Sequence, residues 1–250
     1  MVNFSLFLFR TMVLSAGMLV NENTNCTLFI LAGGLGSRLR EVEPDIPKPI
    51  VDILGVPFIC RLIEQYKSKA FTKIVVSTGF KAEIVERTIR HYSGNDIEFV
   101  RESIPLGTGG ALINFASQCK TENIIVINGD TYFDNLEWLN LNEVSFSNPI
   151  IYGKHATYND RYGTIISEDG KFRSWGLIGA SNLIHIGVFS CSLTHLKKTY
   201  PELQYENLSL EKHIIPKIAI DNQIKILEIN CDFIDIGVPA DLAKFRSNYE

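Results

Sequence analysis

The stretch that decides the fold reads Thr27-Leu28-Phe29-Ile30-Leu31-Ala32-Gly33-Gly34-Leu35-Gly36-Ser37-Arg38-Leu39-Arg40. Its apolar start, Thr27–Leu31, predicts a short buried strand. Gly33 and Gly34 then let backbone N–H groups approach a phosphate or a flat base without a Cβ in the way. Arg38 offers a planar fork that suits phosphate oxygens, and Lys48 in the following Pro-Lys-Pro adds a compact positive charge. This combination favours a site for a nucleoside triphosphate.

The turn differs from two better-known phosphate loops. No Gly-Lys-Ser/Thr follows it, and its glycines have the wrong spacing for the dinucleotide pattern G-x-G-x-x-G. Many glycine-rich loops that follow a strand bind no ligand, so the interpretation depends on the motifs further along the chain.

The composition is that of an ordinary globular protein. At 250 residues, with 46% hydrophobic and 21% charged, the chain is long enough for one domain or a compact pair. A net charge of −4 without a dense Lys/Arg run disfavours a nucleic-acid polymer as partner. The five cysteines are scattered, which fits reduced thiols in a cytoplasmic protein better than a zinc site or a disulfide scaffold.

The first 25 residues are expected to form an extension outside the fold, which then occupies residues 26–250. Residues 1–20 are apolar, but Arg10 lies inside the run, which suits neither a signal peptide nor a membrane span. We therefore expect no stable membrane insertion, and an interfacial anchor remains the alternative. Met12 and Met18 are internal candidates for the start of the protein.

Strand-like and helix-like segments alternate in the first half. The expected strands are Thr27–Leu31, Lys73–Thr78, Ile97–Arg101 and Ile124–Asn128, and the expected helices are Pro57–Lys69, Lys81–Tyr92 and Thr108–Cys119. This alternation predicts a three-layer α/β fold of the Rossmann-like kind: a mixed, mostly parallel sheet with helices on both faces. Ligands of such sheets gather at the carboxyl ends of the strands, where the glycine-rich turn falls.

The second half is richer in strands. The expected strands are Pro149–Ala156, Tyr162–Ser167, Phe172–Trp175 and Leu183–Ser190, with a hairpin turn at Glu168-Asp169-Gly170. Helices are expected at Ser192–Thr199, Asn207–Ile215 and Pro239–Arg246. We expect this half to share the sheet and to add an acceptor site.

Two carboxylates have the setting of metal ligands. Asp130 follows a buried strand in Asn128-Gly129-Asp130, and Asp235 lies inside the apolar run 233–236, where an unpaired charge is costly. Mg²⁺ takes one or two carboxylates and leaves its other positions to water and phosphate. The alternatives are a strand-end turn residue for Asp130 and a structural ion pair for Asp235.

A second glycine-rich turn, Leu106-Gly107-Thr108-Gly109-Gly110-Ala111, opens the third helix. Thr108 is expected to cap that helix, which leaves free N–H groups for a base, ribose or phosphate. The alternative is a tight strand-to-helix turn that binds nothing.

Together these motifs resemble the sugar-1-phosphate nucleotidyltransferases. The family's glycine-rich signature with Arg, its Pro-Lys-Pro, its Leu-Gly-Thr turn, its Asn-Gly-Asp and its late Asp-Ile-Gly all occur in order, between residue 28 and about residue 242. Three longer stretches, 128–134, 160–164 and 233–239, resemble the bacterial D-glycero-D-manno-heptose 1-phosphate guanylyltransferases.

The resemblance implies transfer of a nucleoside monophosphate, GMP from GTP, to the 1-phosphate of this heptose or of a mannose-like sugar, for surface polysaccharide synthesis. It implies Arg38, Lys48, Asp130 and Asp235 as catalytic residues, with Mg²⁺ on the two aspartates. It implies contacts to the nucleotide from Leu31, Gly33, Gly34, Glu102, Gly107, Thr108 and Gly110, and contacts to the sugar from Asn128, His185 and Gly187. A cytoplasmic enzyme is expected, and a homo-oligomer is compatible with the pattern.

Glu102 favours GTP, because a carboxylate accepts hydrogen bonds from guanine N1–H and N2–H₂ together. A solvated acid at a strand end is the alternative, and uridylyl-transferring relatives also carry a Glu in this neighbourhood. The chain departs from the family at Ser174-Trp175, where a Glu-Lys pair is usual, and at His185–Phe189, where an Asn precedes Gly-x-Tyr. The nucleotide half therefore matches the pattern better than the sugar half.

Two other functions compete with this reading. A glycosyltransferase that uses a nucleotide sugar also places a carboxylate after a strand, but it needs no grip on a triphosphate. A non-catalytic regulatory subunit would fit the altered acceptor segments, but it would not need the set of Arg38, Lys48, Asp130 and Asp235.

Overall fold

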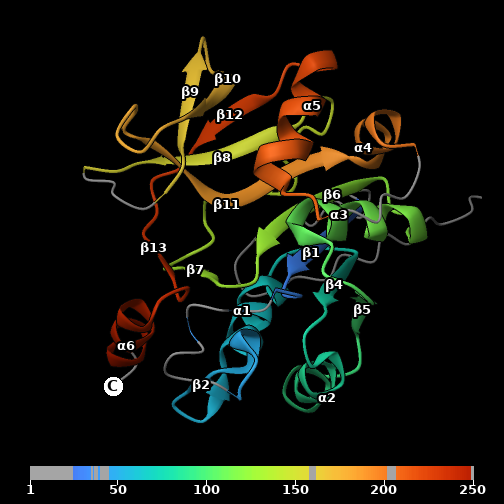
Figure 1. The fold of residues 1–250 in the computed structure, drawn as a ribbon, viewed down its shortest axis with the longest axis vertical. Helices are drawn as coiled ribbons and strands as arrows, with labels where there is room; N and C mark the ends of the chain where they lie inside the picture. The colour runs from blue at the N-terminus through green and yellow to red at the C-terminus, as the bar shows by residue number, and fades with distance from the viewer. Residues whose placement is uncertain are drawn as a thin grey trace, which may run out of the picture.

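The computed structural model describes residues 25–34, 36, 39, 45–157, 162–201 and 207–248. Within them, nine strands form one sheet in the order β5-β4-β1-β6-β11-β8-β12-β10-β9 (Figure 1). Its parallel part consists of β1 (Cys26–Leu31), β4 (Lys73–Thr78), β5 (Ile97–Arg101) and β6 (Asn123–Asn128). The sheet continues with β8 (Ile150–His155), β9 (Thr164–Glu168), β10 (Lys171–Gly176), β11 (Leu183–Ser192) and β12 (Lys225–Glu228).

The second half of the chain shares the sheet of the first half, as the sequence predicts. Strand β11 runs antiparallel to both β6 and β8 and so joins the two parts. Strand β12 is parallel to β8 and lies beside β10, whose hairpin with β9 turns at Asp169 and Gly170. The sheet is therefore mixed, and its parallel part is the end that carries the glycine-rich turns.

The β1 register brings the carboxyl ends of three strands together. Leu31 at the end of β1 is paired with Ser77 of β4 on one side and with Asn128 of β6 on the other. The N–H of Gly129 donates to the carbonyl of Leu31 at 2.9 Å and extends this alignment beyond the strands. The turns that follow β1, β4 and β6 consequently open at one place.

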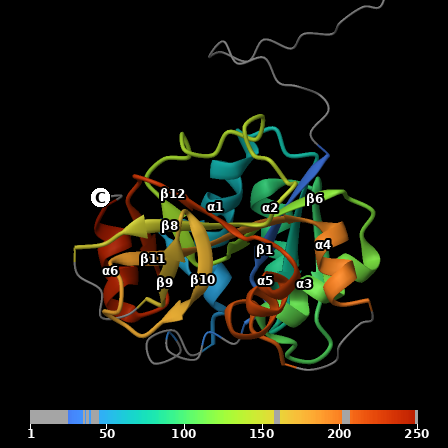
Figure 2. The same ribbon diagram turned by 90° about the horizontal axis from the view of Figure 1, so that it is seen from above.

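Helices cover both faces of the sheet (Figures 1 and 2). One face packs on α1 (Phe58–Lys67), α2 (Ala82–Ser93) and α6 (Pro239–Ser247), and the other packs on α3 (Gly107–Gln118), α4 (Leu193–Thr199) and α5 (Ile215–Asp221). Alternation along β1 explains both cores, since Leu28 and Ile30 belong to the first and Phe29 to the second. Phe29 stacks on Phe115 of α3 with ring centroids 4.5 Å apart.

Short elements complete the fold around the strand ends. The 3₁₀ turn η2 (Lys48–Ile50) precedes a small hairpin of β2 (Asp52–Ile53) and β3 (Val56–Pro57). Strand β7 (Thr131–Phe133) pairs with β13 (Phe233–Asp235) in a separate two-stranded sheet. The helix expected at Asn207–Ile215 is instead a π-helical turn, η3 (Leu210–Ile214), and α5 begins at Ile215, where Pro216 fits the first turn.

In the part of the chain that the structure describes, no helix is both long and apolar enough to cross a membrane. The expected extension 1–25 falls outside the described residues except for Asn25, so its separation from the fold stays a prediction.

Candidate active site

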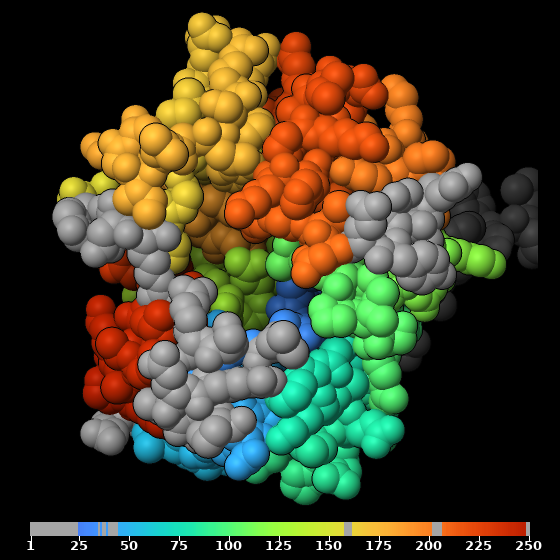
Figure 3. Space-filling view, viewed as in Figure 1, coloured from blue at the N-terminus to red at the C-terminus, as the bar shows by residue number. Residues whose placement is uncertain are grey.

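A cavity of about 640 Å³ opens at the carboxyl ends of β1 and β6. Figure 3 shows it as a hollow beneath the orange segment near residue 210, with blue residues of β1 and olive residues of β6 at its floor. Eight of the residues proposed from the sequence to be catalytic or to bind nucleotide or metal lie in its wall, namely Leu31, Gly33, Gly34, Lys48, Glu102, Gly107, Thr108 and Asp130. Asn128, proposed to contact the sugar, lines it as well. Arg38 lies outside the described residues.

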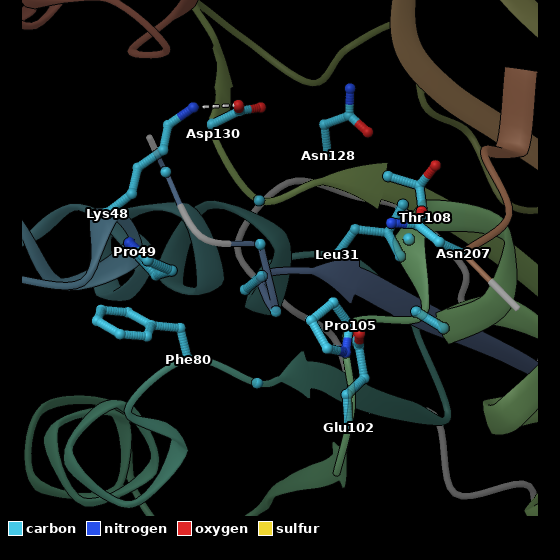
Figure 4. A pocket seen from close by; sticks show the side chains of 18 of the residues that line it. Leu31, Lys48, Pro49, Phe80, Glu102, Pro105, Thr108, Asn128, Asp130 and Asn207 are labelled. Atoms are coloured by element: carbon cyan, nitrogen blue, oxygen red, sulfur yellow. Dashed lines mark hydrogen bonds and ion pairs between the residues drawn. The ribbon is translucent and has the colours of Figure 1, made fainter. Parts of the chain in front are cut away.

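The Glu102 carboxylate is fixed at the cavity wall by two donors. The Ser77 hydroxyl donates to Oε1 at 2.7 Å, and the N–H of Leu106 donates to Oε2 at 3.1 Å. The carboxylate also lies against Gly33, where a Cβ would come within 2.3 Å of Oε1. Glu102 is therefore a positioned, half-buried acceptor rather than a mobile strand-end acid. In Figure 4 it lies on the opposite side of Leu31 from Asp130.

The second glycine-rich turn is built differently from the prediction. Thr108 makes no cap for α3; its hydroxyl accepts a hydrogen bond from the N–H of Leu210 at 2.8 Å. The N–H groups of Gly109 and Gly110 donate to the carbonyl of Leu208 at 2.7 and 3.3 Å. These donors are therefore used by segment 207–210, and Gly110 is not one of the described lining residues. The expectation of free N–H groups was therefore wrong at Gly109 and Gly110, because a distant segment docks on the helix start.

Lys48 and Asp130 form an ion pair inside the cavity (Figure 4). Lys48 begins η2, where Pro47 and Pro49 restrict the backbone on either side. Asp130 follows β6, and the Thr131 hydroxyl donates to its Oδ1 at 3.4 Å. The two side chains are 14% and 28% exposed, so the pair is partly shielded but reachable. The structure thus brings together two of the four residues predicted to be catalytic.

Asp235 lies next to this pair through the β7–β13 sheet. Asp235 pairs with Thr131 in register, and the N–H of Ile236 donates to the backbone carbonyl of Asp130 at 3.0 Å. The Asp235 carboxylate accepts a hydrogen bond from the N–H of Gly237 at 2.5 Å, and Gly237 lines the cavity. Asp235 itself is not among the described residues that line the cavity, and it is partly exposed.

The three residues predicted to contact the sugar have different positions. Asn128 lines the cavity, and Gly187 lies directly against its amide. His185 packs on Trp175, with ring centroids 5.3 Å apart, and its Nε2 lies 3.2 Å from the carbonyl oxygen of Val188. Burial lowers the pKa of His185, which outweighs the opposing effect of the Glu211 charge. Among the described residues, His185 is not one that lines the cavity.

Segment 207–211 is a wall that the sequence analysis missed. Asn207 and Glu211 both line the cavity. The Ser209 hydroxyl donates to Glu211 Oε2 at 2.9 Å, and Trp175 Nε1–H donates to the Glu211 carbonyl at 2.6 Å. Ser209 gives a helix-start signal in the sequence. No local pattern shows that the following turn lies in the same cavity as the Asn-Gly-Asp motif, which is about 80 residues earlier in the chain.

Comparison with known proteins defines the class. The nucleotidyl transferase family model matches residues 28–173, more than half of the chain, and the chain belongs to that family. It is 32% identical over 227 residues to D-glycero-alpha-D-manno-heptose 1-phosphate guanylyltransferase of Aneurinibacillus thermoaerophilus, an alignment that covers 88% of this chain and 97% of that protein.

Two further relatives agree with this class. The protein of the same name from Campylobacter jejuni is 33% identical over 231 residues, covering 88% of this chain and 98% of the relative. The crystal structure of HddC from Yersinia pseudotuberculosis, complexed with GMP-PN, is similar with a TM-score of 0.77 and 33% identity, over 90% of this chain and 99% of that one.

Proposed function

We propose that this protein transfers the guanylyl group of GTP to D-glycero-α-D-manno-heptose 1-phosphate and releases pyrophosphate. The observation that carries the proposal is the alignment with two guanylyltransferases for this sugar, at 32% and 33% identity over 97% and 98% of their lengths. The cavity at the strand ends supports it, because a lysine and an aspartate face each other there beside glycine-rich turns.

The reaction needs no covalent intermediate with the protein. A phosphate oxygen of the sugar phosphate attacks the α-phosphorus of GTP, and a new P–O bond forms. The bond from that phosphorus to the oxygen bridging the β-phosphate breaks, and pyrophosphate leaves with the electron pair. The attacking oxygen is already ionised, so no general base is required. The protein then contributes alignment of the two anions and neutralisation of their charge.

Lys48 is proposed to neutralise phosphate charge during transfer. Its ammonium stands in the cavity, 14% exposed, at the edge formed by η2 and the end of β6. Arg38 is proposed to hold the outer phosphates, on the strength of its place in the glycine-rich motif. Lys48 is bound to Asp130 in this structure, and we propose that substrate binding transfers the lysine from the carboxylate to phosphate.

Asp130 and Asp235 fit a Mg²⁺ site. Both are hard oxygen donors, and Asp235 is paired in register with Thr131, the residue that follows Asp130. Two carboxylates suffice for a Mg²⁺ whose other ligands are phosphate oxygens and water. The cation, when bound, would screen the repulsion between the two substrates.

The base is proposed to bind beside Gly33 and Glu102, which lie against each other in the cavity wall. Leu31, Gly34, Gly107 and Thr108 complete this part of the wall, and the Glu102 carboxylate accepts from guanine N1–H and N2–H₂. Uracil offers one N–H and two carbonyls, and those carbonyls meet no donor in a carboxylate. Gly110 is not proposed to contact the nucleotide, because its N–H donates to the carbonyl of Leu208.

The sugar is proposed to bind at the end of the cavity formed by Asn128, Asn207 and Glu211. Their amide and carboxylate groups match sugar hydroxyls as donors and acceptors. His185 and Trp175 support this wall from behind, through the Trp175 hydrogen bond to the Glu211 carbonyl.

Product analysis tests the proposal. Each of four nucleoside triphosphates is offered with each of a panel of sugar 1-phosphates, pyrophosphate is measured, and the second product is identified by mass. We expect pyrophosphate and GDP-heptose from GTP and D-glycero-α-D-manno-heptose 1-phosphate, and much slower release with the D130N variant. A glycosyltransferase would instead release a nucleoside diphosphate, and a regulatory subunit would release neither.

A further inference from the structure

Two carboxylates hold the ends of β4 and β5 from opposite faces of the sheet. Glu102 is on the cavity side and receives the Ser77 hydroxyl. Glu86 of α2 is on the other side and receives the hydroxyl of Thr78, the next residue of β4, at 2.8 Å. Side chains alternate between the two faces along a strand, so Ser77 and Thr78 at the end of β4 point to opposite faces and donate to different carboxylates.

Glu86 also binds the residue that precedes Glu102. Arg101 Nε donates to Glu86 Oε1 at 3.1 Å, and Nη2 donates to Oε2 at 2.9 Å. The two strand ends are themselves joined, since the N–H of Glu102 donates to the carbonyl of Thr78 at 2.7 Å. Glu86 therefore contacts both strands at the residues next to Ser77 and Glu102, which shape the base end of the cavity.

The charge on Glu86 is buried and fully engaged. Its side chain is 8% exposed. Burial alone would raise its pKa, but the hydrogen bonds from Arg101 and Thr78 and the charge of Arg101 hold the pKa below its ordinary value. A buried ion pair gives little net stability over an apolar replacement, because desolvation offsets the attraction. What this network does fix is the geometry of the strand ends.

We propose that Glu86 is a positioning residue for nucleotide selection: through Thr78 and Arg101 it holds Ser77 and Glu102 in the arrangement that reads the guanine edge. The inference rests on the proposed use of GTP. Without Glu86, the ends of β4 and β5 relax, the Ser77–Glu102 bond loosens, and the carboxylate no longer meets both guanine donors at once.

The test compares binding of GTP with binding of ITP, whose base lacks only the N2 amino group. Dissociation constants for both are measured by calorimetry on the full chain, for wild type and for E86Q. We expect the preference of wild type for GTP to fall by about five-fold in E86Q, the effect of one hydrogen bond. The triphosphate contacts are common to both ligands, so general weakening cancels in the ratio.

Two further variants separate positioning from a merely structural role. E98Q removes the exposed ion pair of Lys73 and Glu98, which joins the same two strands at their other ends, at 2.7 Å. We expect E98Q to leave the GTP-to-ITP ratio unchanged. In the E102Q background, E86Q should cause no further loss of preference, because its effect passes through Glu102. If E86Q fails to fold, T78V is used in its place: it keeps the shape of the Thr78 side chain and leaves Glu86 unchanged, but removes the hydroxyl that donates to Glu86. T78V should also lower the GTP-to-ITP ratio.

An unchanged ratio in E86Q or T78V would overturn the inference, as would independent losses in E86Q and E102Q. A wild type that binds GTP and ITP equally would overturn it as well. Failure of the proposed function looks different, because it is an absence of pyrophosphate release in the wild type and leaves the binding ratios measurable.

Discussion

The ammonium of Lys48 and the carboxylate of Asp130, 82 residues apart in the chain, are paired with each other in the cavity. Each has a proposed duty toward a different partner, the lysine toward phosphate and the aspartate toward Mg²⁺. Each charge is neutralised by the other until substrates bind. The two proposed functions, phosphate binding by Lys48 and metal binding by Asp130, can be separated by replacing one residue at a time.

Replacing Lys48 by Met should reduce transfer but not metal binding. We expect kcat/KM to fall by about 2–4 kcal/mol of transition-state stabilisation, the size of one lost electrostatic contact. Mn²⁺, titrated without nucleotide and followed by electron paramagnetic resonance, should bind K48M more tightly than wild type, because the ammonium no longer competes for Asp130. K73M, which removes an exposed ion pair elsewhere, is the control for both measurements. Weaker Mn²⁺ binding in K48M would contradict the exchange.

Asp130→Asn and Asp235→Asn should each keep the fold and lose metal-supported turnover, by about 2–4 kcal/mol of barrier. The fold survives in D235N because an amide oxygen still accepts from the N–H of Gly237. Melting temperatures and Mn²⁺ affinity are measured beside kcat. Near-wild-type rates and metal affinity in D235N would remove Asp235 from the metal site and leave Asp130 as the carboxylate of the pair that lines the cavity.

Much of the sheet could be predicted because its strands are buried apolar runs. Lys73–Thr78 and Ile97–Arg101 agree with the predicted bounds at both ends. Strand β12, Lys225–Glu228, was not expected, because it is only four residues long, two of them charged, and its residues are mostly exposed and carry no burial signal. The helix expected at Asn207–Ile215 was only partly right: it begins at Leu210 as the π-helical turn η3 and continues as α5 to Asp221. Hydrogen-bond register depends on packing rather than on local pattern, so the π form could not be predicted.

The residues of the candidate site could be predicted where they belong to a continuous motif, and not where they come from distant segments. Motifs that are continuous in the sequence, such as Gly33-Gly34 and Asn128-Gly129-Asp130, supply cavity residues as predicted. Contacts between distant segments were missed: the wall of Asn207 and Glu211, and the docking of Leu208 on the second glycine-rich turn. A single sequence records which residues are present, but it does not record which segment closes over a helix start.

Gly187→Ala should damage activity through Asn128. Gly187 has a φ of +75°, and an added Cβ would lie 2.5 Å from Asn128 Nδ2. The left-handed backbone costs about 1–2 kcal/mol for Ala, which lowers the melting temperature. Gly170 in the β9–β10 turn is a matched control, because its φ is +68° and nothing lies within 4 Å of its added Cβ. We expect both variants to lose similar stability and only G187A to lose kcat/KM for the sugar phosphate. Equal activity in the two would show that Asn128 does not need its present position.

A protein that starts at Met18 should be stable and fully active. The first described contacts of the fold begin at Asn25, whose carbonyl accepts from the N–H of Asn123 at 3.2 Å, and β1 begins at Cys26. Melting temperature and kcat/KM are compared with those of the full chain. Unfolding of the shortened protein would place residues 1–17 in the core and overturn the expected boundary at residue 26.

Glu102→Gln should lower the preference for GTP over UTP without abolishing transfer. The glutamine oxygen can accept from the N–H of Leu106 while its amide group faces the Ser77 hydroxyl, which can itself accept, so both partners of the carboxylate remain satisfied. Guanine then loses one of two charge-assisted hydrogen bonds, which we expect to cost about 2–3 kcal/mol of discrimination.

The measurement is the ratio of kcat/KM for GTP and UTP with one sugar 1-phosphate, in wild type and E102Q. Ser77→Ala is the companion variant. It keeps the charge of Glu102 but removes the donor that orients Oε1, so it should lower the ratio less than E102Q does. If wild type prefers UTP, CTP or dTTP, or if E102Q leaves the ratio unchanged, backbone groups of the Gly33 and Gly107 turns read the base, and the carboxylate is a structural clasp between β4, β5 and the Leu106 turn. Transfer to a sugar 1-phosphate would still stand in that case, because the proposed roles of Lys48 and Asp130 toward phosphate and Mg²⁺ do not depend on which base is bound.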